Sequence, residues 1–176
     1  MSWLERCARE LAGPMLWLDV GATLARLLVG VAIATVVGWA LGLALGRSER
    51  VWRRVEPLVD FVRAIPPVLA FPVCLILFGY SEQARVAAIV FGTTGIIVLH
   101  VASGLARAPV ARRDTARLAG LRGLGLVLRV DVFETLPSLL LGARIALTAG
   151  LIVSVVSEML VGCEHGLGAR AVAARS

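Results

Sequence analysis

The chain contains no lysine and only one tyrosine, and aromatic residues make up 6% of its 176 residues. All 18 of its basic residues are arginine. A phosphate-binding loop of the GxxxxGK[ST] type needs a lysine to contact the nucleotide phosphates. The chain therefore holds no Walker motif of that kind, and we expect it to bind neither ATP and magnesium nor any other cofactor itself.

Cysteine is also scarce. Cys7, Cys74 and Cys163 lie far apart, and Cys74 falls inside an apolar run, so neither a disulfide framework nor a metal site of paired cysteines is predicted. The adjacent Cys163, Glu164 and His165 cannot supply a closed four-ligand site from one turn. Ser-His-Asp, HExxH and paired-carboxylate arrangements are missing as well. We expect no metal site, no catalytic residue and no enzymatic activity.

Apolar residues are abundant, at 59% of the chain with a mean hydropathy of +0.87. This composition predicts an all-α integral membrane protein in a lipid bilayer. The net charge of +6 reflects where the arginines lie and does not indicate nucleic-acid binding. An amphipathic pattern predicts an interfacial segment over residues 1–20. Uncharged or nearly uncharged runs predict a bundle of about four transmembrane helices, at about 27–46, 64–81, 86–106 and 138–163.

Small residues recur every fourth position through the first predicted span. They would form one face of a helix along which a second backbone can pack closely. The residues of this helix-packing ridge are Gly30, Ala34, Gly38, Gly42 and Gly46.

The second predicted span contains Pro66, Pro67 and Pro72. Each proline removes a backbone donor and clashes with the preceding turn, so the span must be kinked or partly unwound and covered by protein. Two interpretations stay open. The kink is either a packing feature or a helix start that lines a translocation path and flexes as it opens.

The last predicted span carries Arg144 near its start and Glu158 near its end. Fourteen residues of helix separate them by about 21 Å, so they cannot pair within one helix. We expect each side chain to reach the nearer membrane interface. Because a charge within a span is a functional candidate, Glu158 also remains a candidate for the translocation path or its gate.

The segment 107–137 is the one long polar stretch between apolar runs. Pro109 suits the first turn of a helix that runs to about Ala119, and Gly120 supplies a stop. Leu124, Leu128 and Val132 would line a second short helix that Pro137 closes. The segment is predicted to be a helix-turn-helix.

Arginine counts in the short loops indicate the orientation. Segments 47–63 and 107–129 hold five and six arginines, against six in the segments on the other side. The positive-inside rule then places loops 47–63 and 107–137 in the cytoplasm.

The helix-turn-helix resembles the cytoplasmic EAA loop of inner-membrane permeases of bacterial binding-protein-dependent ABC importers, the MetI-like superfamily. Asp114, Thr115, Ala116 and Gly120 match Glu-Ala-Ala and its glycine, and Val130 matches the later apolar position. Val132-Phe133 replaces the expected Leu-Pro, whereas Leu136-Pro137 matches a second Leu-Pro of the family.

Two further runs are similar to the nitrate, sulfonate and taurine branch of these permeases. They are RAIPPVLAFPVCLILFG, which begins at Arg63, and GARIALTAGLIVSVVSEMLVG with the later Gly166-Leu167-Gly168. The resemblance covers about residues 22–168 as a permease transmembrane domain and leaves 169–176 as a C-terminal tail. Relatives usually have a further span at each end, so the resemblance implies a MetI-like core without its usual first and last spans.

The resemblance implies a permease subunit in the bacterial cytoplasmic (inner) membrane. It would pair with a copy of itself or a sister permease, receive substrate from an extracytoplasmic substrate-binding protein, and contact a separate ABC ATPase that binds ATP and magnesium. The alternative is a non-transporting or truncated scaffold that binds partners without moving substrate. The residues implied in ATPase coupling are Asp114, Thr115, Ala116, Arg117, Gly120, Val130, Leu136 and Pro137.

Overall fold

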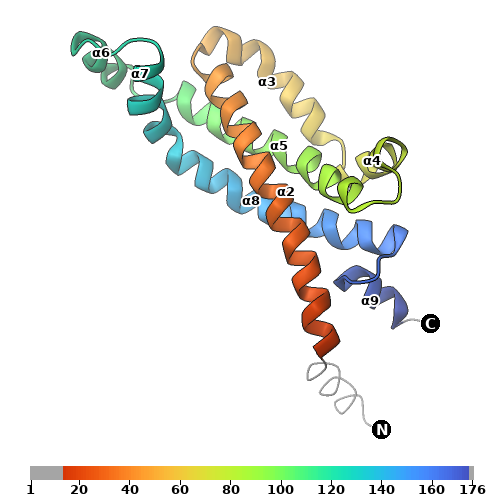
Figure 1. The fold of residues 1–176 in the computed structure, drawn as a ribbon. Helices are drawn as coiled ribbons and strands as arrows, with labels where there is room; N and C mark the ends of the chain where they lie inside the picture. The colour runs from red at the N-terminus through yellow and green to blue at the C-terminus, as the bar shows by residue number, and fades with distance from the viewer. Residues whose placement is uncertain (1–13, 175–176) are drawn as a thin grey trace.

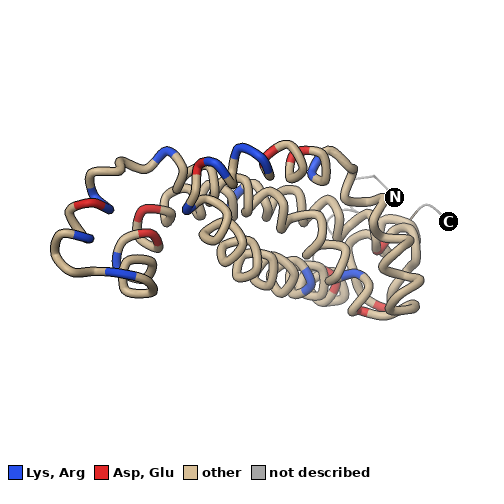
Figure 2. Tube along the Cα trace, turned by 90° about the horizontal axis from the view of Figure 1, so that it is seen from above, with Lys and Arg blue, Asp and Glu red and all other residues tan. Residues whose placement is uncertain are grey.

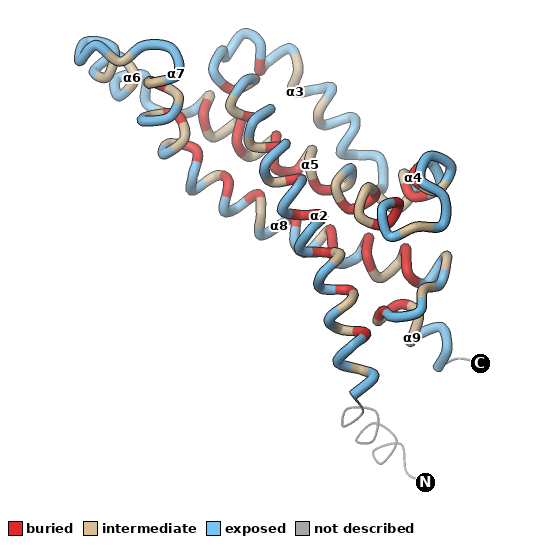
Figure 3. Tube along the Cα trace, viewed as in Figure 1, coloured by how far each residue is buried: buried red, intermediate tan, exposed pale blue. Residues whose placement is uncertain are grey.

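The computed structural model describes residues 14–174, and this part of the chain is helical throughout apart from short connections, which confirms the predicted all-α fold. The three long helices are α2 (Pro14–Gly46), α5 (Glu82–Ala106) and α8 (Val132–Val161). They pack closely in the order α2, α5, α8, and α2 also contacts α8 (Figure 1). Buried residues follow the faces that these helices turn toward one another (Figure 3).

Three helices are long and apolar enough to cross a membrane, or four if one bent pair counts as a single span. The bent pair joins α3 (Glu49–Ala64) to η1 (Pro67–Ala70) and α4 (Phe71–Phe78) at an angle of 81°. The predicted span 64–81 is therefore not one helix. Its helical part α4 has eight residues, about 12 Å, which is too short to span a bilayer alone.

The prolines explain this break. Pro66 is the N-cap of η1, Pro67 is its first residue, and Pro72 lies in the first turn of α4. At these positions the missing backbone donors would have no partner within the helix. Pro67 also lies against Gly92 of α5, where an added Cβ would be 2.5 Å from the proline Cβ. The bend is thus held by packing on α5.

Helix α3 lies beside α5, not beyond the ends of the spans. Trp52 is buried against Val98 and Ala102, and a Cβ built on Gly95, near the middle of α5, would be 3.9 Å from the Cβ of Arg63. Segment 47–63 is therefore not a simple loop, because burial of Trp52 and the apolar side of α3 draws it along the bundle.

The first span is longer than predicted, since α2 begins at Pro14 and not near residue 27. The predicted interfacial segment 1–20 lies mostly outside the described residues, and its last part is the beginning of α2. The small-residue ridge faces α5 along its whole length, and all five of its residues are buried. A Cβ on Gly30 or Gly42 would lie 2.6 Å from side-chain atoms of Ile89 or Val101.

The last span is also longer than predicted. Helix α7 (Leu124–Leu126), a π-helical turn η2 (Val127–Asp131) and α8 follow one another directly, and together they form a 38-residue apolar stretch. The prediction that Pro137 closes a separate short helix is wrong, because Pro137 lies inside α8. It is exposed there, and as a proline inside a helix it removes one backbone hydrogen bond.

After α8, the chain turns at Gly162 and Gly166 into the short helix α9 (Leu167–Ala173), which packs on α8. The expected boundary between residues 168 and 169 falls within α9. Helix α9 and the start of α2 lie at one end of the elongated bundle, and α6 (Val110–Leu118) and α7 lie at the other (Figure 1).

Candidate functional site

Helix α6 is a short helix at the end of the bundle (Figure 1). Pro109 precedes its first residue as the N-cap, and the helix ends at Leu118. Gly120 follows with φ +88°, a left-handed conformation that strongly favours glycine. The amide of Leu121 donates to the Ala116 carbonyl at 3.0 Å, which closes the turn. The helix and its glycine stop thus lie where the sequence predicts them.

The predicted coupling residues fall into two groups. Asp114, Thr115 and Arg117 are exposed on α6, where the Asp114 carboxylate accepts a hydrogen bond from Arg117 at 3.2 Å. Ala116 is half-buried under them. The other group is part of the last span: Val130 is in η2, and Leu136 and Pro137 are exposed on α8.

Sequence reasoning missed the residue that joins these groups. Asp131 is 1% exposed, and its carboxylate accepts a hydrogen bond from Arg113 Nε of α6 at 2.8 Å. On the other side it faces Arg47 Nε, just after α2, at 3.5 Å. Arg112 of α6 adds a 2.6 Å bond to Glu134 of α8, and this bond raises the pKa of the Arg112 guanidinium. Arginines therefore tie α6 to the ends of two spans. The sequence signal that could have indicated Asp131 was an acidic residue between two apolar ones, Val130 and Val132.

The surface around α6 mixes charge with exposed apolar side chains. Leu118 is 89% exposed, and arginines and acids gather on this part of the chain (Figure 2). A hollow of about 670 Å³ opens between the α6 turn and the end of α2. Its lining consists of Arg47, Asp114, Arg117, Leu118, Leu121, Arg122, Gly123 and Leu126. Large apolar side chains that stay exposed beside charges are typical of a surface that meets another protein.

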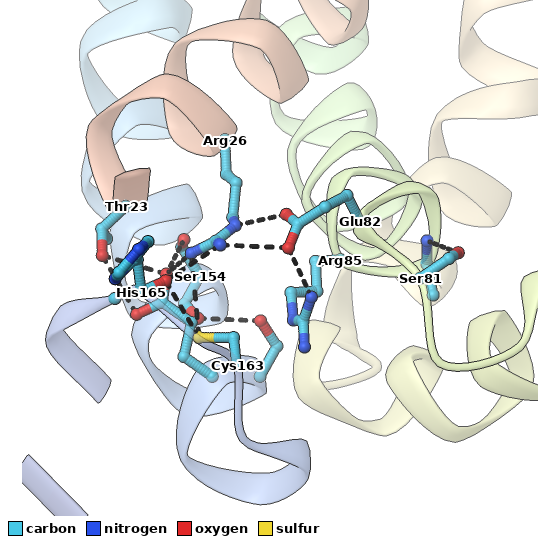
Figure 4. A network of polar contacts seen from close by, with 12 residues as sticks. Thr23, Arg26, Ser81, Glu82, Arg85, Ser154, Cys163 and His165 are labelled. Atoms are coloured by element: carbon cyan, nitrogen blue, oxygen red, sulfur yellow. Dashed lines mark hydrogen bonds and ion pairs between the residues drawn. The ribbon is translucent and has the colours of Figure 1, made fainter. Parts of the chain in front are cut away.

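Glu158 lies near the opposite end of α8 and is fully buried. Its carboxylate accepts hydrogen bonds from Thr23 Oγ1 at 2.9 and 3.0 Å, from Arg26 Nη1 at 2.8 Å and from the Gly168 amide at 2.9 Å (Figure 4). The expectation that its side chain extends outward to the membrane interface is wrong, because buried donors from α2 and α9 hold the carboxylate inside the bundle.

The network extends from Glu158 across this end of the protein. Arg26 also bonds Glu82, the first residue of α5, and Arg85 bonds the same carboxylate at 2.7 Å (Figure 4). Asp19 accepts bonds from the Gly166 amide and from Arg170, both at 3.0 Å. These contacts lock α2, α5, α8 and α9 together.

The first turn of α9 is fitted closely to α8. A Cβ on Gly168 would lie 2.3 Å from the Val155 carbonyl oxygen, so only glycine allows this approach.

Burial raises the pKa of the nearby Cys163 thiol, and the weaker electrostatic effect of the Arg26 charge lowers it. No group of three or more His, Cys, Asp or Glu residues suited to a metal ion occurs within residues 14–174.

Fold and polar clusters together define an all-helical membrane protein with a polar helix-turn at one end and a buried ionic network at the other. Residues 27–176 match the family model described as the binding-protein-dependent transport system inner membrane component. The chain belongs to this family of transport permeases, and the resemblance noted from the sequence is confirmed.

Among curated proteins, the chain is similar to the nitrate import permease protein NrtB of Leptolyngbya laminosa, with 29% identity over 84% of this chain and 53% of that protein. It is 33% identical to the formylaminopyrimidine transport permease ThiX of Halalkalibacterium halodurans, over 90% of this chain and 63% of ThiX. The taurine permease TauC of Escherichia coli is 27% identical over 90% of this chain and 59% of TauC. The chain thus spans between one half and two thirds of the length of these relatives.

Proposed function

We propose that this chain is a transmembrane permease subunit of a bacterial ABC importer, which forms the translocation path together with a second copy or a sister permease. In this proposal α6 and the Gly120 turn dock on a separate ABC ATPase that binds ATP and magnesium. An extracytoplasmic substrate-binding protein delivers the substrate at the α9 end. Family membership and the relatives named as permeases support this assignment.

The observation that carries the coupling role is the double ion pair of Asp131. A docked ATPase that moves α6 would pull on Arg113, and through Asp131 the force would act on the start of α8 and on Arg47 at the end of α2. The pair with Arg113 is the tighter of the two, at 2.8 Å with a side chain 17% exposed, whereas Arg47 is 43% exposed at 3.5 Å. Movement of α6 is thereby converted into movement of two spans.

The surface chemistry of α6 suits a protein partner. Leu118 and Val110 are exposed apolar anchors beside Asp114 and Arg117, and the neighbouring hollow could receive a partner side chain. Apolar anchors surrounded by charges are typical of binding hot spots. The positive-inside rule, applied to segments 47–63 and 107–129 together, supports a cytoplasmic position for this end.

Near the middle of α5, the bend at Pro66 and Pro67 is our candidate for an element that changes angle when the bundle rearranges. The relatives are named for nitrate, formylaminopyrimidine and taurine, which are chemically diverse. We therefore assign the choice of substrate mainly to the binding protein that delivers it.

Gly120 and Asp114 test the coupling role. Gly120→Arg forces a bulky residue into the left-handed conformation, and Asp114→Arg reverses the charge beside Arg117. Both should abolish ATP-driven uptake and reduce co-purification of the ATPase at least about tenfold, with membrane insertion unchanged. Gly120→Asn is the matched control, because asparagine tolerates the left-handed region. It should retain most of the co-purification.

Normal ATPase binding by both arginine variants would overturn the coupling assignment. If the wild-type chain binds its ATPase but the reconstituted complex moves no solute carried by the co-purifying binding protein, the chain is a scaffold and not a permease. Uptake and co-purification are measured on the same preparations so that these two results can be separated.

A further inference from the structure

Arg144 occupies a position that its sequence context does not reveal. The polar groups that mark the two ends of α8 are Asp131 and Glu158, each buried among arginines. Arg144 is 13 residues from one and 14 from the other, or about 20 Å of helix rise in each direction. It therefore lies near the middle of the last span and not near its start, as the sequence predicted, because this span already begins at Leu124.

The Arg144 side chain lies on the outside of the single protomer. It is exposed, and within residues 14–174 it has no ion pair or side-chain hydrogen bond. Leu140, Leu141 and Ile145 are its exposed apolar neighbours on α8. An arginine at the centre of a helix in hydrocarbon costs about 2.5 to 3.5 kcal/mol on insertion scales, so such residues face protein or water.

A polar groove ends one helical turn from Arg144 on α8. It measures about 520 Å³ and lies between α3, α5 and α8. Leu141, which lines the groove, is one turn before Arg144 on α8. Arg144 itself lies outside the lining, one turn further along α8. The groove is lined by Glu56, Asp60, Arg63, Leu99, His100, Ser103, Gly104, Arg107, Ser138 and Leu141.

The charges inside the groove balance without Arg144. Its two acids, Glu56 and Asp60, are matched by Arg63 and Arg107, and Asp60 is paired with Arg63 at 3.0 Å. The acids of α2, α5 and α8 lie near the ends of these helices, at Asp19, Glu82, Glu134 and Glu158. A second copy related by a twofold axis along the membrane normal would place its own acids at the same depths. Arg144 is thus an extra positive charge at mid-membrane.

We infer that Arg144 lines the translocation path between the two paired permeases and binds an anionic group of the substrate as it passes. This inference rests on the proposed permease function and adds a residue and a charge class to it. Two Arg144 side chains that approach across the twofold axis would repel each other unless an anion lies between them. An anionic substrate group in that place gains two charge-assisted hydrogen-bonding partners.

The test uses water-soluble thiol reagents on the full chain in open membrane fragments, so that both faces are accessible. Cys7, Cys74 and Cys163 are first replaced by serine. Leu141→Cys then reports on the path, and Val36→Cys is the matched control. Val36 is 69% exposed on α2 and lies midway between Arg26 and Arg47, at a similar depth.

Leu141→Cys should react with anionic and cationic methanethiosulfonates at least about tenfold faster than Val36→Cys. Adding Arg144→Gln should lower the ratio of the anionic to the cationic rate about tenfold, since a nearby charge acts in opposite directions on the two reagents. Arg144→Lys should preserve the ratio. Equal reactivity at the two cysteines, or a ratio that Arg144→Gln leaves unchanged, would overturn the inference.

The outcome is separable from that of the proposed function. If the ATPase co-purifies normally but Leu141→Cys shows no preference for the anionic reagent, the inference of an anion site is wrong and the permease assignment stands. A charge preference that depends on Arg144 in a chain that never binds an ATPase supports a cationic path and overturns the importer assignment.

Discussion

Glu158 shows how a buried charge can be a structural feature of a membrane protein. It is fully buried at the α9 end, and its two oxygens accept bonds from Thr23, Arg26 and the Gly168 amide. A carboxylate whose lone pairs are filled in this way has little capacity left for a passing solute. Its translocation role, which the sequence suggested, stays untested, and the contacts favour a role in holding α9.

Removal of the Glu158 carboxylate should therefore destabilise the fold. Glu158→Ala leaves Arg26 partly unpaired in a buried site, and breaking a buried ion pair costs about 3 to 5 kcal/mol. The free energy of unfolding in detergent should fall by that amount. Glu49→Ala breaks an exposed pair with Arg53 and should cost less than about 1 kcal/mol. Equal losses in the two variants would show that the Glu158 network does not stabilise the bundle.

Cys163 makes a pH-dependent prediction at the same end. Burial raises the pKa of its thiol, and the Sγ atom donates to the His165 carbonyl at 3.1 Å. The thiolate is the reactive form, so less of it is present at neutral pH than in an ordinary cysteine. In a chain with Cys7 and Cys74 replaced, alkylation by iodoacetamide should keep rising with pH after the rate at an exposed Leu118→Cys has levelled. Identical pH profiles would contradict the raised pKa.

At the scale of elements, close packing between α2 and α5 depends on residues without side chains. Gly30, Gly38, Gly42 and Gly46 leave room for Ile89, Ile97, Val101 and the Ala102 backbone. In lipid there is no hydrophobic gain from helix association, so close van der Waals contact of this kind carries much of the energy.

The same substitution at two sites on α2 separates packing from helix propensity. A Cβ on Gly42 would lie 2.6 Å from Val101 Cβ, whereas Gly21 has no atom within 4 Å of such a Cβ. Gly42→Ala should lower the free energy of unfolding by about 1 to 3 kcal/mol through overpacking. Gly21→Ala should be neutral or raise it by up to about 1 kcal/mol. A stable Gly42→Ala variant would show that α2 and α5 can separate without cost.

On the scale of the whole molecule, charged residues lie mainly at the two ends and along α3 (Figure 2). The Asp131 cluster marks one end and the Glu158 network the other. Between Arg26 and Arg47, α2 carries no charge over about 31 Å, which matches the thickness of a hydrocarbon layer. The two clusters therefore lie on opposite sides of the membrane if α2 spans it.

Single cysteines test this arrangement. In a cysteine-free chain, Leu118→Cys lies at the α6 end and Tyr80→Cys beside the start of α5, and both native side chains are more than four-fifths exposed, at 89% and 84%. An impermeant maleimide should label Tyr80→Cys in intact spheroplasts and Leu118→Cys in inverted vesicles. The reverse result would invert the proposed orientation, and labelling of both cysteines from one side would show that α5 does not cross the membrane.

Local rules were sufficient for much of the fold. Apolar run length predicted the helical class, four-residue spacing predicted the ridge that faces α5, and Pro109 and Gly120 predicted the bounds of α6. Such features depend on backbone geometry and transfer energies that a short stretch of sequence carries by itself.

Tertiary structure decided the roles of the charged residues. Asp131 forms ion pairs with Arg113 and Arg47, which are 18 and 84 positions away in the sequence. Glu158 accepts hydrogen bonds from Thr23, which is 135 positions away. Arg144 was predicted at the edge of a span but lies near its centre, because α7, η2 and α8 follow one another without a break and α8 continues through Pro137. The free energy of a charged side chain in a membrane protein depends on its depth and on partners that are distant in the sequence. The sequence by itself therefore determined which helices form. Only the packing of these helices decided what each charged residue does.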